Sequence, residues 1–368
     1  MKNFKSSKII AMLPPSENNP RNSEGSFLRL DGNRIAFAYS RFHGGEMNDF
    51  GASDIVCIYS YDNGESFDTE NVEVLVTGKE YNTENVMSVT LRRMDNGDIG
   101  LFYAMKIEGE TLRTEYYLRR YKGNFSHPCG EVMVVPGRYP GYYVINNDRV
   151  QRLSNGRWMV PTSYHPSFLR SDESDKLAQL DLRGTVYCFF SDDDGFSWHT
   201  SSARIDLNDH NSGSGLREPG IVELPGGTLY GYFRTDRGYQ YESVSIDGGD
   251  NWFAPRPSKF TSPDSPMLIK KNPHSGRYYA IWNPVPGYFG KPDPRAVWGR
   301  TPLVMAESLD GVHFSKPVAI EDDPLCGFCY PAIEFLDEKT LLVAYCSGGS
   351  AEKACLNRIT VRKLELDM

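Results

Sequence analysis

The stretch RMDNGDIGLFYA, from Arg93 to Ala104, combines a tight turn with a buried strand. The apolar Met94 is followed by Asp95 and then by the sequence Asn-Gly, which is typical of hairpin turns whose central residues need a positive φ. Apolar and aromatic residues then follow almost without a break, as in a strand that is buried in a core. The stretch therefore predicts a β-hairpin whose turn contains Gly97.

Five further stretches repeat this design. They are RLDGNRIAFAYS (29–40), RLSNGRWMVPTS (152–163), ELPGGTLYGYFR (223–234), NPHSGRYYAIWN (272–283) and FLDEKTLLVAYC (335–346). The turn positions are Gly32, Gly97, Gly156, Gly227, Gly276 and Glu338, and they recur with a period of about 60 residues, as the units of a radial array do. Six repeats at this spacing, with almost no amphipathic helical sequence, predict an all-β fold. We expect a six-bladed β-propeller with four-stranded antiparallel blades.

A second repeated segment combines Ser, Asp, Gly and an aromatic residue at fixed spacing. Three copies are SYDNGESF (60–67), SDDDGFSW (191–198) and SIDGGDNW (245–252), and SLDGVHF (308–314) is one residue shorter. In such a turn the Asp accepts backbone N–H bonds, the Gly adopts a positive φ, and the aromatic ring packs between sheets. We expect structural turns between the outer strands of the blades.

The N-terminal segment KIIAML (8–13) predicts a short strand ahead of the first hairpin. A ring of sheets has to close, and we expect this strand to complete the last blade, because that removes an exposed sheet edge. No linker or shift in composition divides the chain, so residues 1–368 are expected to form a single domain.

Composition argues against several classes of partner. The 368 residues carry a formal net charge of −8, whereas binding to nucleic acid or to an anionic membrane needs a basic face. The sequence has no apolar run long enough for a membrane span, so none is expected. The N-terminus lacks the apolar segment of a secretory signal, which predicts a cytoplasmic protein unless a leader has been removed.

The seven cysteines are odd in number and scattered, which favours reduced, buried thiols over a disulfide framework. Cys326 and Cys329 form the one Cys-x-x-Cys pair. A structural zinc site would need a second pair of ligands, and a thioredoxin-like motif would need a βαβ context. We expect both thiols to pack where the last blade begins, so that their replacement leaves activity largely intact.

Polar residues recur about ten positions before the hairpin turns, where a structural strand would carry apolar ones. They are Arg21, Asn85, Asn146–Arg149, Glu218 and Tyr330. In a propeller the inner strands begin at one face around the axis, so these residues are expected to converge. Asn85, Asn147, Asp148 and Arg149 would then line a substrate pocket. A buried polar network between blades is the alternative for Asn147–Arg149.

Along nearly its whole length the sequence resembles the exo-sialidases (neuraminidases), and its Ser-Asp-Gly segments resemble their Asp-boxes. In that family three arginines bind the substrate carboxylate, a tyrosine paired with a glutamate is the nucleophile, and an aspartate is the acid/base. The resemblance implies Arg21 as the first arginine, although PRNSEG stands in place of the family's Y/F-R-I-P motif. It also implies Asp49, in SRFHGGEMNDFGASDIV, as the acid/base. Asp54 is a competitor that lies deeper in a strand.

The fourth repeat carries the sharpest match. In REPGIVELPGGTLYGYFRT, Glu218 and Arg234 stand on the two sides of one hairpin, as the family's glutamate and second arginine do. Arg300, in GRTPLVMAESLDG, stands shortly ahead of the fourth Ser-Asp-Gly segment, where the third arginine is expected. Tyr330 follows at the start of the last repeat. The resemblance implies that Tyr330 and Glu218 form the nucleophilic pair.

The chemistry of the substrate explains this set of residues. A 2-keto sugar acid carries a carboxylate on its anomeric carbon, and guanidinium groups hold such an anion in a fixed geometry. A neutral tyrosine avoids the repulsion that a carboxylate nucleophile would meet, and sialidases are an exception to the usual pair of carboxylates. The mechanism requires no metal and no cofactor. Arg41 is a further candidate for substrate binding, with a solvated surface arginine as the alternative.

Two classes of function remain open from the sequence. One is a retaining exo-hydrolase that releases terminal sialic acid, or a related 2-keto-3-deoxy sugar acid, from sialylated or related glycans. The other is a non-catalytic, lectin-like propeller, which would carry the same structural turns. A lectin would not need all six catalytic-type residues together, and this favours the enzyme.

Overall fold

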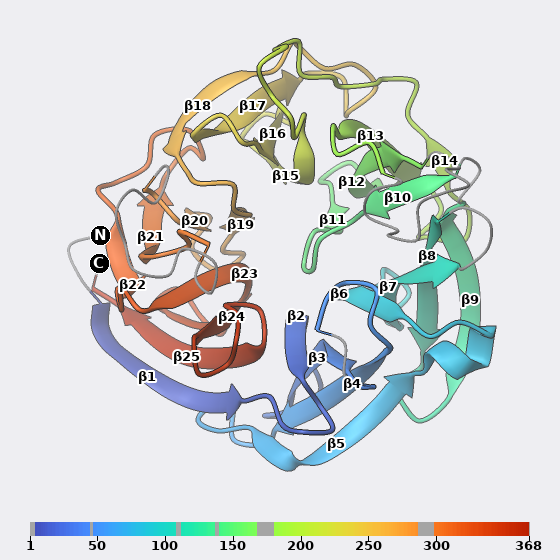
Figure 1. The fold of residues 1–368 in the computed structure, drawn as a ribbon, viewed down its shortest axis with the longest axis vertical. Helices are drawn as coiled ribbons and strands as arrows, with labels where there is room; N and C mark the ends of the chain where they lie inside the picture. The colour runs from blue at the N-terminus through green and yellow to red at the C-terminus, as the bar shows by residue number, and fades with distance from the viewer. Residues whose placement is uncertain are drawn as a thin grey trace.

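The computed structural model describes residues 4–44, 47–107, 112–136, 140–167, 180–285 and 298–367. Within these ranges the regular structure is β-strand, apart from the short 3-10 helix η1 (Gly78–Tyr81). The prediction of an all-β protein is therefore confirmed. The sheets are arranged in a ring around a central axis (Figure 1). Across the same ranges, no helix has the length and apolar character needed to cross a membrane.

Four of the sheets have four strands each. The first contains β2 (Arg21–Arg29), β3 (Ile35–Phe42), β4 (Ser53–Ser60) and β5 (Asp68–Val76). Another contains β15 (Arg217–Glu223), β16 (Leu229–Arg234), β17 (Tyr239–Ser245) and β18 (Arg256–Thr261). The next contains β19 (Leu268–Lys271), β20 (Tyr278–Trp282), β21 (Leu303–Ser308) and β22 (Val318–Glu321). The last contains β23 (Cys326–Phe335), β24 (Thr340–Gly349), β25 (Arg358–Leu366) and β1 (Phe4–Leu13).

The fifth sheet has nine strands and departs from the regular pattern expected from the sequence. Its strands are β6 (Val86–Arg93), β7 (Ile99–Ile107), β8 (Arg113–Tyr121), β9 (Pro128–Val135), β10 (Gly141–Val144), β11 (Gln151–Arg152), β12 (Trp158–Pro166), β13 (Thr185–Ser191) and β14 (His199–Thr200). A single parallel pair, Gly141 with Arg113, joins β10 to β8. Strands β10 and β11 both pair with β12, because residues 145–150 interrupt the strand between them.

All six predicted hairpins are present. They are β2–β3, β6–β7, β11–β12, β15–β16, β19–β20 and β23–β24. Gly97, in the turn between β6 and β7, has φ of 88° and an open space at the position of a Cβ. The backbone conformation, and not crowding, therefore requires glycine there. Figure 1 shows the first strand of each hairpin on the inner side of the ring.

The four Ser-Asp-Gly segments form one kind of turn. In the first, the Asp62 carboxylate accepts hydrogen bonds from the Ser60 hydroxyl at 2.8 Å and from the Ser66 backbone N–H at 3.0 Å. The Ser60 hydroxyl in turn accepts the Gly64 N–H at 2.8 Å. Equivalent bonds are made around Asp193, Asp247 and Asp310. The aromatic residue that ends each segment packs against a hydrophobic cluster, as Phe67 does.

The first and the last strand of the described residues lie in one sheet. Strand β1 pairs antiparallel with β25, from Phe4 opposite Leu366 to Leu13 opposite Ile359. The strand expected over residues 8–13 is therefore longer and begins at Phe4. Strand β1 pairs with the outer edge of β25, so β1 and not β25 is the edge strand of this sheet (Figure 1). The hydrogen bonds between these two strands hold the N-terminal and C-terminal parts of the chain together.

The hydrophobic core lies between neighbouring sheets. Phe37 and Val56 of the first sheet pack in one cluster with Leu342 and Val361 of the last. Burying each such side chain contributes about 1.5–3 kcal/mol. Gly25 allows this close packing on β2, because a Cβ there would lie 2.2 Å from the Phe37 ring. The packing fixes the inner strands, whose first residues surround the axis.

Candidate active site

A cavity of about 610 Å³ lies where the inner strands β2, β15 and β23 begin. Six of its lining residues are those that the sequence assigned to catalysis and carboxylate binding: Arg21, Asp49, Glu218, Arg234, Arg300 and Tyr330. They come from both ends and the middle of the chain. The cavity thus brings together the three arginines, two carboxylates and one phenol that were assigned to the site.

A left-handed backbone conformation recurs eight or nine residues before five of the six hairpin turns. The residues are Glu24, Ser88, Asp148, Glu218 and Tyr330, with φ of 56°, 63°, 57°, 45° and 52°. Four of them lie at a bulge in β2, β6, β15 or β23, where the strand register shifts. A bulge redirects a side chain, and this conformation is unusual for residues other than glycine. Of the five, all but Asp148 line the cavity.

Tyr330 and Glu218 contact each other across the cavity. The Tyr330 hydroxyl donates a hydrogen bond of 2.8 Å to Glu218 Oε1. The other carboxylate oxygen, Oε2, is buried and has no hydrogen-bond partner among the described residues. Glu218 is therefore placed to accept the phenol proton, and one of its oxygens remains available.

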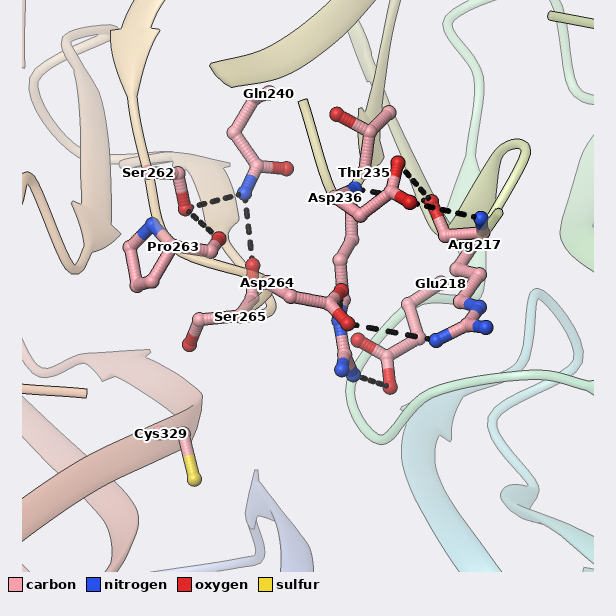
Figure 2. A network of polar contacts seen from close by, with 12 residues as sticks. Arg217, Glu218, Thr235, Asp236, Gln240, Ser262, Pro263, Asp264, Ser265 and Cys329 are labelled. Atoms are coloured by element: carbon pink, nitrogen blue, oxygen red, sulfur yellow. Dashed lines mark hydrogen bonds and ion pairs between the residues drawn. The ribbon is translucent and has the colours of Figure 1, made fainter. Parts of the chain in front are cut away.

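Arg234 holds the Glu218 carboxylate from the neighbouring strand β16. Its Nη1 atom donates to Glu218 Oε1 at 2.7 Å, and its Nε atom donates to Asp264 Oδ1 at 2.5 Å. Asp264 also lies 3.5 Å from Arg217 Nη1, and Figure 2 shows it beside Arg217 and Glu218. The arginine is fixed from two sides, which pre-organises its guanidinium group.

A loop between β18 and β19 presents Asp264. The Gln240 side chain donates to the Ser262 hydroxyl at 3.0 Å and to the Ser265 carbonyl at 2.8 Å, and so it holds both sides of the aspartate (Figure 2). Gln240 itself lies buried on β17. The buried amide of Gln240 thus positions the loop that carries Asp264, and the Asp264 carboxylate positions Arg234.

Arg300 lies on the tyrosine side of the cavity. Its Nη1 atom lies 3.3 Å from Cys329 Sγ, and its Nη2 atom donates to the Asp264 carbonyl at 3.3 Å. The guanidinium carbon lies 5.0 Å from the centre of the Trp298 ring and 5.6 Å from that of Tyr330. No carboxylate side chain contacts Arg300 among the described residues, so its charge is the least neutralised of the three.

Arg21 carries two carboxylate partners. Its Nη1 atom contacts Asp49 Oδ1 at 2.7 Å, and its Nη2 atom lies 3.3 Å from Glu24 Oε1. The Arg21 side chain is only 1% exposed, whereas that of Asp49 is 41% exposed. Asp49 is therefore the partner that can move away, while Arg21 is fixed in the wall.

The segment that carries Asp49 is held at its backbone. Asn85 donates to the carbonyl of Asp49 at 3.2 Å and to that of Gly51 at 2.6 Å. The ammonium group of Lys106 lies 4.5 Å from the centre of the Phe50 ring, which adds a cation–π contact. Asn85 was predicted to line the pocket, but it is placed behind Asp49 and outside the lining.

The electrostatics of the cavity set the resting protonation of the tyrosine pair. Burial raises the pKa of the Tyr330 phenol well above its ordinary value, and the Glu218 charge adds to the rise. Burial also raises the pKa of Glu218, but Arg234, Arg300 and the Tyr330 hydrogen bond outweigh it and hold that pKa below its ordinary value. The pair therefore rests as a neutral phenol beside a carboxylate, the arrangement of a nucleophile and its base.

Three residues predicted to line the pocket do not line it. Asn147 lies behind the wall and donates to the Gly25 carbonyl at 2.8 Å. Asp148 is buried in an ion-pair cluster, and Arg149 is buried with a hydrogen bond to the Met267 carbonyl. The structure therefore corrects the prediction for Asn147, Asp148 and Arg149, which form a buried polar network between sheets. Their neighbour Asn146 is the residue of this run that does line the cavity.

Arg41 and Asp54 also lie outside the cavity lining. They face each other in the register of β3 and β4. The Asp54 carboxylate lies 3.3 Å from His43 Nε2. The two residues belong to the strand pair of the first sheet, so Arg41 is not placed to contact a ligand in this cavity.

Sequence reasoning missed several residues of the site, above all Glu24 and Asp264. A signal for Glu24 existed, because Glu24, Ser88, Asp148, Glu218 and Tyr330 all stand eight or nine positions before their hairpin turns. A strict count at this spacing would have found Glu24 and Ser88. Asp264 lies in a loop that carries no motif, and Trp298 and Tyr142 follow no repeat.

The Cys326–Cys329 pair divides into two different environments. Cys326 is half-buried, whereas Cys329 is fully buried and packs with Cys346 and Cys355. Burial raises the pKa of the Cys329 thiol, but the hydrogen bond with Cys355 and the Arg300 charge outweigh it and hold the pKa at about 7. Among the described residues, no group of three or more His, Cys, Asp or Glu is arranged to hold a metal ion.

Cys329→Ala should weaken binding of a carboxylate ligand, and Cys326→Ala should not. The first change removes the sulfur that lies 3.3 Å from Arg300, so the guanidinium loses a positioning contact. We expect a loss in affinity of about fivefold to tenfold, the size of one ordinary hydrogen bond, because the thiol is a weak partner. The measurement is the inhibition constant of a carboxylate ligand for both variants. Equal constants would restrict Cys329 to a packing role.

A ring of β-sheets with recurring Ser-Asp-Gly turns and an arginine-lined central cavity defines a sialidase-like fold. The family described as "BNR repeat-like domain" matches residues 142–341, which is more than half of the chain. The chain belongs to this family.

Solved structures share this fold at low sequence identity. A protein of unknown function from Dyadobacter fermentans superposes with a TM-score of 0.70 at 16% identity, over 99% of this chain and 100% of the other. A mutant of the NanB sialidase from Streptococcus pneumoniae has a TM-score of 0.69 at 12% identity, over 97% of this chain and 70% of the other. The intramolecular trans-sialidase from Ruminococcus gnavus has a TM-score of 0.68 at 12% identity, over 100% of this chain and 99% of the other. No curated protein sequence matches the chain.

Proposed function

We propose that this protein is a retaining exo-glycosidase that releases terminal sialic acid, or a related 2-keto-3-deoxy sugar acid, from glycans. The observation that carries the proposal is the 2.8 Å hydrogen bond from Tyr330 to Glu218, in a cavity that also holds Arg21, Arg234 and Arg300. A glycan-binding protein could use the arginines alone. It would have no need for a buried phenol paired with a carboxylate.

In the first step, the Tyr330 oxygen attacks the anomeric carbon while Glu218 accepts the phenol proton. Asp49 donates a proton to the glycosidic oxygen as that bond breaks. The product of this step is a glycosyl group bound to Tyr330. In the second step, Asp49 takes a proton from water, the water oxygen attacks the anomeric carbon, and Glu218 returns the proton to Tyr330. Two inversions give net retention.

The three arginines bind and orient the substrate carboxylate. Burial raises the pKa of Asp49, but Arg21, Lys106 and Arg234 outweigh it and hold the pKa below its ordinary value. A substrate carboxylate at Arg21 displaces Asp49 from its contact with that arginine. Losing this contact raises the pKa of Asp49, so substrate binding itself prepares the acid for proton donation.

The same proposal includes the architecture. Residues 1–368 would form one six-bladed propeller, with the nine-stranded sheet counted as two blades that meet at the Gly141–Arg113 pair. Six hairpins around one axis support this count. The four Ser-Asp-Gly turns would be Asp-boxes, a structural feature away from the site. The printed names of the structural neighbours, sialidase and trans-sialidase, support a glycan with a terminal sugar acid as substrate.

A panel of aryl glycosides tests the function. We expect release of the aryl group from the α-glycoside of at least one of sialic acid, its deaminated analogue and the eight-carbon relative. The first sugar product should keep its configuration, which NMR of the fresh reaction reads directly. An aryl glucoside, which lacks the carboxylate, is the control and should not react. Binding of sialylated glycans without turnover, unchanged in Glu218→Ala and Tyr330→Ala, would favour the lectin-like class instead.

A further inference from the structure

Glu24 is a third carboxyl group inside the candidate site. It lies at the bulge of β2 with φ of 56°, lines the cavity, and is only 4% exposed. Its position on β2 matches those of Glu218 on β15 and Tyr330 on β23. The mechanism proposed above gives Glu24 no role, although it is as deeply placed as the two residues that carry the chemistry.

The contacts of Glu24 fix it in place. Its Oε1 atom lies 3.3 Å from Arg21 Nη2, and its Oε2 atom accepts a hydrogen bond of 3.2 Å from the Ser88 hydroxyl. Its backbone N–H points to Cys346 Sγ at 3.4 Å. The side chain of Asp49, the other carboxylate on Arg21, is 41% exposed, whereas that of Glu24 is 5% exposed. When a new anion approaches Arg21, Asp49 can move aside and Glu24 cannot.

Several charged and titratable groups face Glu24 from the surrounding elements. Besides Arg21 on its own strand, they are Asp49 in the β3–β4 connection, Glu218 on β15, Tyr330 on β23, Tyr142 on β10 and Cys346 on β24. Burial, together with the Asp49 and Glu218 charges, raises the pKa of Glu24 to about 7, against the lowering effect of Arg21 and Ser88. Around neutral pH, the group is close to the point at which it gains or loses its proton.

A ligand carboxylate beside Arg21 adds a negative charge next to the carboxylate of Glu24, which is buried and held in place. Like charges at this distance in a poorly solvated site favour the neutral form of one of them. We infer that Glu24 takes up one proton when a carboxylate ligand binds at Arg21, and that in this form it donates a hydrogen bond within the bound complex. The inference rests on the proposed function, because it assumes that this cavity receives a sugar acid.

Proton uptake makes ligand affinity depend on pH. Below about pH 7, Glu24 is already protonated in the free protein, and binding requires no further proton. Above that pH the free protein must gain the proton on binding, so affinity falls about tenfold per pH unit. Glu24→Gln carries the neutral group permanently and should remove this fall. Ser88→Ala removes a hydrogen bond to the ionised form, so its affinity should begin to fall at a higher pH.

Calorimetric titration with the 2,3-unsaturated analogue of the sugar acid tests the inference without turnover. Titrations at pH 6, 7 and 8, each in two buffers of different ionisation enthalpy, give the number of protons taken up. At pH 8 we expect the wild type and the control Glu334→Gln to take up about one more proton per ligand than Glu24→Gln, because any proton that Asp49 gains on leaving Arg21 is common to all three proteins. Glu334 is a matched control, because burial also raises its pKa and it lines a separate cavity.

The outcomes separate the two proposals. Binding without proton uptake in the wild type, or equal uptake in the wild type and in Glu24→Gln, would contradict the role of Glu24 and leave the proposed function standing. A wild type that does not bind the analogue at any pH would contradict the proposed function and, with it, the inference. If Glu24→Gln folds poorly, Ser88→Ala gives a second test through the pH at which ligand affinity begins to fall. A higher pH than in the wild type supports the inference, and an unchanged pH opposes it.

Discussion

Replacing Tyr330 with phenylalanine should lower kcat for aryl sugar-acid glycosides by roughly 10³-fold or more, the range expected when a nucleophile or its proton acceptor is lost. The change removes the oxygen that donates the 2.8 Å hydrogen bond to Glu218. It leaves the ring, whose centre lies 5.6 Å from the Arg300 guanidinium carbon. Packing and carboxylate binding should therefore persist. The measurement is kcat from aryl release, alongside the dissociation constant of the unsaturated analogue.

Tyr345→Phe is the matched control for this experiment. Tyr345 is a buried phenol on β24 that bonds to the carboxylate of Glu321, outside the cavity lining. Its loss should leave kcat unchanged. A Tyr330→Phe variant that keeps more than roughly a tenth of the wild-type kcat would be inconsistent with a nucleophilic tyrosine.

Asp148→Asn should destabilise the fold by about 3–5 kcal/mol, the usual cost of breaking a buried ion pair by removing one partner. The Asp148 side chain is 0% exposed and lies 2.7 Å from Arg92 Nη1 and 2.9 Å from Lys270 Nζ. It also accepts the Ile333 backbone N–H at 3.2 Å. Asparagine tolerates the left-handed backbone at this position, so the change isolates the loss of charge. Urea denaturation at pH 7 measures the difference in the free energy of unfolding.

The pH dependence of this difference follows from the pKa of Asp148. Burial raises that pKa, but the charges of Lys270 and Arg92 outweigh the effect of burial and lower the pKa to about 2. The ion pairs therefore contribute fully above the ordinary pKa of an aspartate, near 4, and their contribution is lost as the pH falls toward 2. The gap between wild type and Asp148→Asn should shrink over the same interval. Asp95→Asn, which breaks an exposed pair with Arg152, is the control and should cost at most about 1 kcal/mol. A comparable cost for both variants would contradict the buried cluster.

The fold could be predicted because its signals are local and repeated. A turn glycine such as Gly97 and the aromatic strand after it suffice for a hairpin, and six copies imply a ring. The pairing of Glu218 with Arg234 was also accessible, because the two residues flank one hairpin and the register places Arg217 opposite Arg234. The joining of β8 to β10 through the Gly141–Arg113 pair could not be predicted, because a single backbone bridge leaves no pattern in the sequence.

Side-chain direction limited the prediction of the site. Asp148 and Glu218 occupy matching positions before their turns and share a left-handed backbone, yet Asp148 is buried among cations and Glu218 faces the cavity. The difference arises from Arg92 and Lys270, which reach Asp148 from other strands. Contacts between repeats are a property of the assembled ring. Spacing along one repeat cannot give them.

Peptide mapping of a trapped intermediate tests the role of Tyr330 most directly. A sugar-acid substrate with fluorine at C3 and a good leaving group should form the glycosyl-enzyme and release it slowly, because fluorine destabilises the oxocarbenium-like transition state. We expect a mass increase of one glycosyl group on the peptide that contains Tyr330, and no such increase in Tyr330→Phe. A label on Glu218 or Asp49 instead, or turnover with inverted configuration and no adduct, would contradict tyrosine as the nucleophile.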